Sequence, residues 1–192
     1  MSNSDNIKIL LKNSISTKEE ILQDETIIKN ISNVIQSIEL ALQKNKFIFF
    51  CGNGGSAADA QHMAAELTGR FKIERKSLKG VVLGSNFSSI TAIANDYGYD
   101  DVFSREIYGM GSKGDLLISY STSGNSKNVI NAIKAAKEIG IKSIIFTGKD
   151  GGSAKELSDI SICIPSNNTA RIQESHITIS HIILEIFEEN FK

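Results

Sequence analysis

The stretch from Leu116 to Ile133 reads LLISYSTSGNSKNVINAI and decides the fold class. Residues 116–119 are a short apolar run typical of a buried strand, and from residue 127 the apolar positions have helical spacing. The residues between them, 121–126, therefore form a strand-to-helix turn. Strand, turn and helix in this order are the unit from which parallel α/β sheets are built.

Four other short apolar runs have the same character, and a Gly, Ser or Asn turn and a helical stretch usually follow. Strands are expected at residues 47–51, 81–83, 116–119, 143–146 and 160–164. The intervening helices are expected at residues 57–67, 88–94, 127–139 and 154–157. Most of the runs are continuously apolar rather than alternating, which indicates strands covered on both faces. The sequence predicts an α/β fold with a doubly wound, five-stranded parallel sheet.

Helical patterns flank this region on both sides. Between residues 4 and 44, apolar residues such as Ile31 and Val34 recur at helical spacing, so residues 1–44 form an N-terminal lead-in of two helices. Residues 169–191 should be one long C-terminal helix. Its apolar stripe runs through Ile172, Ile179, Ile183 and Ile186. No Pro- or Ser-rich linker divides the chain, so residues 1–192 are expected to be a single domain.

Charge and composition exclude several classes of protein. The chain has 192 residues, with 21 Lys plus Arg against 22 Asp plus Glu, so it lacks the basic surface of a nucleic-acid or acidic-membrane binder. The densest basic stretch, residues 70–79, is expected to be a solvated loop. Without a leader pattern or an apolar run of bilayer length, we expect a cytoplasmic protein. Cys51 and Cys163 lie in apolar runs and are expected to be buried, reduced thiols.

The turn at residues 121–126 has the chemistry of a phosphate site. A helix that begins after a strand offers free backbone N–H groups and a partial positive charge, so it can hold a dianion without Lys or Arg. Hydroxyl groups come from Ser121, Thr122, Ser123 and Ser126. Gly124 allows close approach of the backbone. The alternative is that Ser126 is a plain helix N-cap. The turn lacks the Lys of a P-loop and the glycine pattern of a dinucleotide site, which favours a smaller phosphate compound.

A second Gly-rich turn, CGNGGS at residues 51–56, begins a helix that contains His62 and Glu66. Ser56 and Asp59 have the spacing of a capping box. His62 and Glu66 are four residues apart, on one face of the helix, and could share a ligand. The alternative is a plain surface contact. Their position close to a Gly-rich ligand turn favours a functional role.

The C-terminal helix adds Gln173, His176 and His181, so all three His of the chain lie on two helices, which we expect to border one cleft. Imidazole, carboxylate and amide oxygen are donors that suit a divalent metal such as Zn²⁺. However, Gln173 and His181 are separated by eight residues, about 12 Å of helix. Either the helix is distorted or the two ligands come from different subunits, and we favour different subunits.

Four motifs, in this order, resemble those of the phosphoheptose isomerases, a family of sugar isomerase (SIS) domains with a flavodoxin-like fold. They are residues 51–57 with His62 and Glu66, residues 94–98 (ANDYG), residues 121–126, and residues 170–174 (ARIQE) with His181. The resemblance covers nearly the whole chain. It implies conversion of sedoheptulose 7-phosphate to D-glycero-D-manno-heptose 7-phosphate, for a bacterial surface polysaccharide.

The resemblance also implies site residues and an assembly. It places substrate contacts at Asn53, Gly54, Gly55, Glu66, Asn95, Asp96, Ser121, Thr122, Ser123, Ser126 and Gln173. It places zinc ligands at His62, Glu66, Gln173 and His181. It further implies a homotetramer whose sites lie at subunit contacts.

Aldose–ketose interconversion needs a base, an acid and stabilisation of an enediolate. Glu66 is our candidate base and His181 our candidate acid. One rival is a non-catalytic SIS module that binds a phosphosugar and would not need His62, Glu66, Gln173 and His181 together. A second rival is an isomerase of another sugar phosphate, which would share this chemistry.

Overall fold

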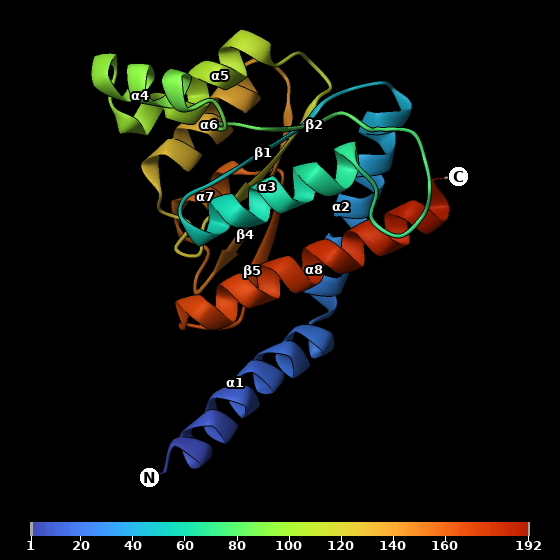
Figure 1. Ribbon diagram of the computed structural model, residues 1–192, viewed down its shortest axis with the longest axis vertical. Helices are drawn as coiled ribbons and strands as arrows, with labels where there is room; N and C mark the ends of the chain where they lie inside the picture. Colours follow the sequence, from blue (N-terminus) through green and yellow to red (C-terminus); the bar gives the residue numbers. More distant parts are fainter. Residues whose placement is uncertain (1, 192) are drawn as a thin grey trace.

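A computed structural model describes residues 2–191 of the chain. In this range five strands form one parallel sheet, in the order β2-β1-β3-β4-β5 (Figure 1). The strands are β1 (Ile48–Gly52), β2 (Gly80–Val82), β3 (Leu116–Tyr120), β4 (Lys142–Gly148) and β5 (Ile160–Ile164). The order reverses between β1 and β3, and ligands of open α/β sheets bind beside such a switch point.

Helices cover both faces of the sheet. They are α1 (Asn3–Gln23), α2 (Glu25–Gln43), α3 (Gly55–Thr68), α4 (Phe87–Asp96), the 3₁₀-helix η1 (Tyr99–Asp101), α5 (Val102–Met110), α6 (Lys127–Glu138), α7 (Gly152–Leu157) and α8 (Thr169–Asn190). Successive side chains of a strand point to opposite faces. Accordingly, Leu116 and Ile118 pack with α2, α3 and α8, whereas Leu117 packs with α5, α6 and α7.

Helices α3 and α8 lie side by side on one face of the sheet and run in the same direction (Figure 1). Three places along their length show the alignment. Gln173 lies against Gly55, His181 against His62, and Glu188 against the backbone of Phe71 just beyond α3. This parallel pair brings the candidate chemistry of the two helices together.

The fold class predicted from the sequence is confirmed, with strand and helix ends displaced by one or two residues in most cases. Helices η1 and α5 were not predicted. Buried Val102, Phe103 and Ile107 give α5 an apolar face, but it follows a polar Asp-rich turn without a strand in between. In the C-terminal helix the stripe was partly wrong, since Phe187 is buried and Ile186 is 39% exposed.

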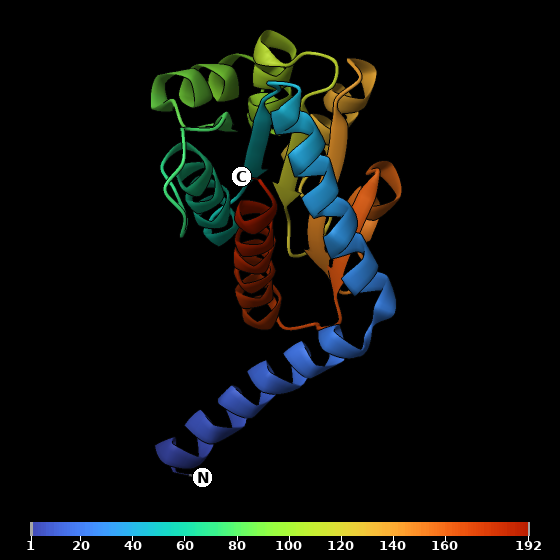
Figure 2. The same ribbon diagram turned by 90° about the vertical axis from the view of Figure 1, so that its right-hand side faces the viewer.

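The lead-in helices differ in how they pack. Helix α2 lies on the sheet, while α1 extends away from the body of the protein (Figure 2). Only Thr17 and Ile21 of α1 are buried, and large apolar side chains remain exposed along it, such as Leu10 and Ile15. None of the described helices is both long and apolar enough to span a bilayer.

The basic stretch at residues 70–79 is not a solvated loop, as the sequence analysis expected. The side chain of Arg75 is only 9% exposed and forms an ion pair of 2.9 Å with Glu188 of α8, whose side chain is 1% exposed. Phe71 packs against the main core. The segment is therefore fixed to α8, by a partner 113 residues away that charge composition does not reveal.

Candidate active site

The turn between β3 and α6 has free N–H groups, as a phosphate site requires. In the described residues, the backbone N–H groups of Lys127 and Asn128 at the start of α6 have no hydrogen-bond acceptor. Ser126 occupies the N-cap position, yet its side chain makes no capping bond and lies 3.0 Å from the hydroxyl of Ser121. The plain N-cap alternative is therefore wrong for its side chain. Both hydroxyls and the helix N–H groups are available to an anion.

Gly124 fixes the shape of this turn. Its φ of +65° is in the left-handed region, and a side chain there would collide with the carbonyl of Gly151. The Gly124 carbonyl in turn accepts a 2.9 Å hydrogen bond from the N–H of Ala154, at the start of α7. Asn125 accepts a second bond from the N–H of Ser153, at 3.0 Å. Two backbone N–H groups at the start of α7 thus hold the turn in place.

A reciprocal amide pair joins the two Gly-rich turns. Asn53 donates to Asn128 at 2.8 Å, and Asn128 donates back at 2.9 Å. The same oxygen of Asn53 accepts a bond from the Tyr99 hydroxyl, at 2.9 Å. Asn128 is 2% exposed. The sequence analysis missed Asn128 and Tyr99, and it assigned Asn53 to substrate. In this structure the Asn53 side chain ties the β1–α3 turn to the β3–α6 turn.

At the start of α3, Gly54 and Gly55 provide bare backbone. Gly54 has a φ of +57° and serves as N-cap without a side-chain bond. A side chain at Gly55 would collide with the amide of Gln173. Gln173 therefore lies over the first turn of α3, in contact with predicted substrate-binding residues.

Seven residues further along α3, a second cluster forms with α8. The Nε2 atoms of His62 and His181 are 2.9 Å apart, and Nε2 of His62 lies 3.3 Å from the Glu66 carboxylate. The Phe71 ring stacks on the His181 imidazole, with ring centroids 5.5 Å apart. Burial and the neighbouring His62 lower the pKa of His181, and Glu66 raises it, with a net lowering. The lowered pKa of His181 favours its neutral imidazole form, in which the ring carries one N–H.

His176 does not border this cleft, contrary to the prediction that all three His would. It is 0% exposed, and its Nε2 lies 3.0 Å from the Thr147 carbonyl, which requires the proton on Nε2. Its ring packs against Tyr120 and Phe146. Burial lowers the pKa of His176 to about 4, although the Thr147 bond raises it. It is a neutral core residue.

Asp59 has a different place from the one predicted. It does not form a capping box with Ser56, because Gly54 is the N-cap and α3 has no side-chain cap. Asp59 is 7% exposed, and its Oδ2 atom has no hydrogen-bond partner in the described structure. Burial raises the pKa of Asp59 to about 6, and His62 lowers it less. A buried, unpaired carboxyl oxygen thus lies in α3, one helical turn before His62.

Comparison with known proteins gives the family. The family model described as SIS domain matches residues 12–148. A phosphoheptose isomerase of Aliarcobacter butzleri is 53% identical over 178 residues, 89% of this chain and 94% of that protein. The chain belongs to the phosphoheptose isomerase family. It is accordingly an isomerase.

Solved structures of this family have the same fold. The phosphoheptose isomerase of Neisseria gonorrhoeae has a TM-score of 0.91 at 38% identity, covering 98% of this chain and 100% of the other. That of Francisella tularensis has a TM-score of 0.93 at 31% identity, with the same coverage. The likeness therefore extends over the whole architecture, including the lead-in helices.

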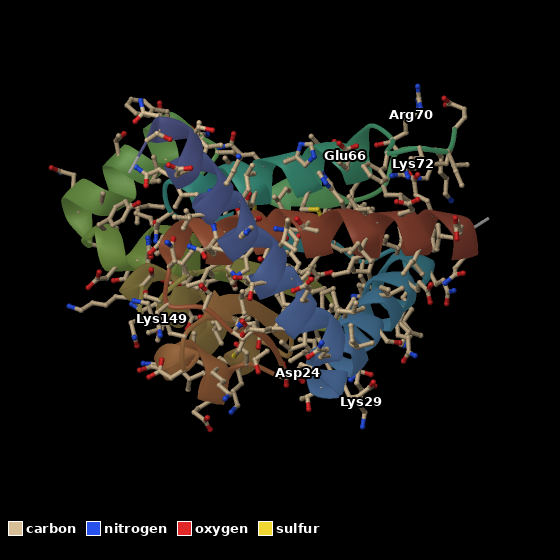
Figure 3. All side chains as sticks on the ribbon, turned by 90° about the horizontal axis from the view of Figure 1, so that it is seen from below. Asp24, Lys29, Glu66, Arg70, Lys72 and Lys149 are labelled. Carbon is tan, nitrogen blue, oxygen red and sulfur yellow. The ribbon has the colours of Figure 1, made fainter. Side chains whose placement is uncertain are left out.

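Within one chain, the structure brings together some of the predicted phosphoheptose isomerase residues and separates others. His62, Glu66 and His181 meet. In Figure 3, Glu66 lies on the same side of the molecule as Arg70 and Lys72. Gln173 is apart from them, at Gly55. Asn95 and Asp96 are exposed at the end of α4, where Asn95 donates to Asp96 at 2.8 Å. In residues 2–191, no three His, Cys, Asp or Glu side chains are arranged to hold a metal ion.

Proposed function

We propose that this site interconverts sedoheptulose 7-phosphate and D-glycero-D-manno-heptose 7-phosphate by proton transfer through an enediol. One observation carries the proposal: His62 and Glu66 of α3 meet His181 of α8, and Asn53 ties the turn that leads into α3 to the phosphate turn. Binding of a phosphosugar alone would require the turn at residues 121–126 but not this cluster.

The proposed steps assign a role to each group. The turn at residues 121–126 and the start of α6 bind the phosphate, which orients the other end of the substrate. Glu66 removes a proton from the carbon next to the carbonyl and returns it to the neighbouring carbon. The N–H of neutral His181 donates its proton to the carbonyl oxygen, which becomes a hydroxyl group, as a neutral imidazole does in other isomerases. The same imidazole nitrogen then takes the proton of the neighbouring hydroxyl, which becomes the new carbonyl, so His181 ends in its starting state.

The cluster supplies the donor types that zinc uses, which are two imidazole nitrogens, 2.9 Å apart, and a carboxylate beside them. Within residues 2–191 of one chain these three side chains do not surround a common position for an ion, so the proposal needs a further ligand and a local adjustment of the side chains. We include Zn²⁺ in the proposal, held by His62, Glu66, His181 and Gln173. When bound, Zn²⁺ would polarise the substrate carbonyl as a Lewis acid. Glu66 cannot be a firm ligand and a free base at once, so it must change its ligation or have only one of these roles.

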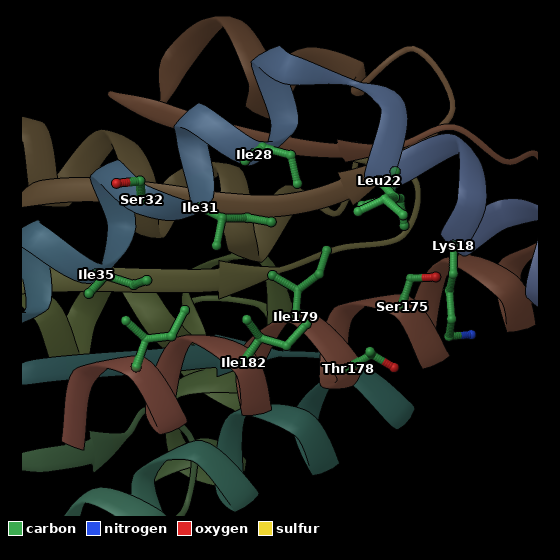
Figure 4. Close-up of a pocket in the computed structure, with 12 residues that line it drawn as sticks. Lys18, Leu22, Ile28, Ile31, Ser32, Ile35, Ser175, Thr178, Ile179 and Ile182 are labelled. Atoms are coloured by element: carbon green, nitrogen blue, oxygen red, sulfur yellow. The ribbon is translucent and has the colours of Figure 1, made fainter. Parts of the chain in front are cut away.

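A homotetramer with sites at subunit contacts is part of the same proposal. Gln173 is about 12 Å of helix from His181, so a neighbouring subunit is the natural source of the fourth ligand. An apolar groove of about 390 Å³ between α1, α2 and α8 also favours self-association (Figure 4). Its walls include Leu22, Ile31 and Ile179. Leu22 is 72% exposed and lines this groove. A contiguous exposed apolar surface of this kind is typical of a contact with another protein rather than of a monomer.

The compartment and the pathway complete the proposal. Cys51 is buried as expected, whereas Cys163 is only half-buried, contrary to the prediction; free thiols at both positions suit the reducing cytoplasm. We propose that the heptose phosphate product serves a bacterial surface polysaccharide, either lipopolysaccharide or capsule.

The test is an NMR assay of purified protein with sedoheptulose 7-phosphate, with and without a chelator. The expected result is an aldose heptose 7-phosphate, with a rate that falls on chelation and returns with Zn²⁺. A six-carbon ketose phosphate is run in parallel, and faster turnover of that compound would favour the isomerase of another sugar phosphate. No aldose product from either compound would favour a non-catalytic binding module.

A further inference from the structure

Glu188, at the end of α8, fixes the segment that follows α3. Its carboxylate accepts hydrogen bonds from three successive backbone N–H groups, those of Phe71 at 3.0 Å, Lys72 at 2.7 Å and Ile73 at 2.9 Å. It also accepts a bond of 2.9 Å from Nε of Arg75. Burial raises the pKa of Glu188, but these bonds and the Arg75 charge lower it overall, so the carboxylate is ionised.

Arg75 connects this carboxylate to the end of α3. Its NH2 atom donates to the carbonyl of Glu66 at 2.7 Å, and its NH1 atom donates to the carbonyl of Leu67 at 2.9 Å. A helix C-terminus has unpaired carbonyl groups and a partial negative charge, so a guanidinium group there stabilises the last turn. Arg75 therefore holds the backbone of the candidate base directly. We name the four-centre arrangement of Glu188, Arg75, the 71–73 backbone and the α3 terminus the clasp.

The clasp also reaches the candidate acid. The three N–H bonds to Glu188 begin at Phe71, and the Phe71 ring stacks on His181, with an interplanar angle of 19°. Because the Phe71 backbone is fixed, its ring limits how far the imidazole can turn. Glu188 is seven residues after His181, so both side chains lie on the same face of α8.

We propose that Glu188 and Arg75 are positioning residues of the isomerase site, which hold Glu66 and His181 in their relative places through the α3 terminus and Phe71. Neither residue touches the reacting atoms in this proposal. The inference rests on the proposed isomerase function, and it adds a role for the basic segment that charge composition alone leaves unexplained.

The test compares clasp variants with a buried carboxylate elsewhere. Glu188→Gln and Arg75→Lys weaken the clasp, and each should lower kcat about 10- to 100-fold while KM for sedoheptulose 7-phosphate changes less than about twofold. The matched control is Asp115→Asn. Asp115 is 3% exposed and accepts the N–H groups of Phe47 and Ser112, just before β3, with no hydrogen bond to α3 or α8. Its loss should lower stability but leave kcat of the folded enzyme within about twofold.

Two further variants keep the test decisive if the clasp variants fold poorly. Phe71→Leu leaves the clasp bonds intact and removes the ring from His181, so kcat should still fall by at least about threefold. Glu185→Gln removes the surface ion pair with Lys72 and leaves the bonds to Glu188 and the Phe71 ring in place, so kcat should not change.

Two results would overturn the inference. One is a Glu188→Gln or Arg75→Lys enzyme with the kcat of the Asp115→Asn control, and the other is a Phe71→Leu enzyme with normal kcat. Absence of turnover by the wild-type protein would instead overturn the isomerase function, and this inference with it.

Discussion

Replacing Asp59 with Asn should stabilise the protein at neutral pH and have little effect in acid. Asp59 is 7% exposed, and its Oδ2 atom has no hydrogen-bond partner in the described structure. Burial raises its pKa from 3.8 to about 6, against a smaller lowering by His62. Each pKa unit corresponds to about 1.4 kcal/mol, so ionised Asp59 lowers the free energy of unfolding by about 3 kcal/mol above pH 6.

The sign follows from proton binding. Between pH 4 and pH 6 the folded chain holds more protons at Asp59 than the unfolded chain, so this group's contribution to stability falls as pH rises. Its contribution is complete below 3.8 and lost above about 6. Asn resembles the protonated acid and does not titrate. The difference in free energy of unfolding between Asp59→Asn and wild type should therefore grow from near zero at about pH 4 to about 3 kcal/mol at about pH 8.

The assay is urea unfolding of both proteins from about pH 4 to about pH 8, at one protein concentration and with a chelator present. A fixed concentration is needed because the stability of a protein that self-associates depends on its concentration. Asp96→Asn is the control, since Asp96 is an exposed carboxylate. The reasoning fails if the Asp59→Asn difference is the same at both ends of the pH range, or if this variant is the less stable protein at pH 8.

Three other substitutions test the site. Glu66→Gln should keep binding of sugar phosphate measurable by calorimetry but lower kcat at least about 100-fold. The control is Glu74→Gln at an exposed carboxylate, which should leave kcat unchanged, and near-normal turnover by Glu66→Gln would contradict its role as base. Gly124→Ala should lower Tm by at least about 4 °C and raise KM, because it combines backbone strain with a collision at Gly151. Gly98→Ala is the control, since Gly98 has a φ of +99° but open space around it, and an equal loss of Tm in both would refute the collision. Asn128→Ala should cost about 1–3 kcal/mol in urea unfolding and raise KM. The control is Asn131→Ala, which removes hydrogen bonds from half-buried Asn131 to Asp100 and Asp101 and should leave KM unchanged; equal effects on KM would argue against the amide pair.

The fold was predictable because its signals are local. A parallel strand buried on both faces is a continuous apolar run, and the turn after it is rich in Gly, Ser and Asn whatever the rest of the chain does. The run at residues 116–119 falls within β3 for this reason, since all five residues of that strand are buried. The prediction of α5 failed because Val102 and Phe103 follow a polar turn rather than a strand, so the alternating βα pattern gave no reason to expect a helix there.

The contacts within the site were less predictable, because they join distant parts of the sequence. The Asn53–Asn128 pair spans 75 residues and the Arg75–Glu188 pair spans 113, and neither pair has a local pattern. The basic composition of residues 70–79 predicted a solvated loop, but hydrogen bonds to one buried carboxylate, that of Glu188, are enough to fix the segment. His176 is a different case, since Ile172 and Ile179 flank it at helical spacing. That stripe was in the sequence and already placed His176 on the core face.

The three faces of α8 explain how one helix serves the core, the candidate site and the apolar groove. Buried Ile172, His176 and Ile183 hold it against the sheet, and this anchoring determines its rotation. With the rotation fixed, Gln173, His181 and Glu188 are seven or eight residues apart on the face toward α3, where they meet Gly55, His62 and the 71–73 backbone in turn. On the remaining face, Ile182 and Ile186 line the apolar groove with α1 and α2. A rotation of α8 by one residue would disturb all three faces together. The packing of the core, the geometry of Glu66 and His181, and the surface available to a second subunit are therefore linked through a single rigid element.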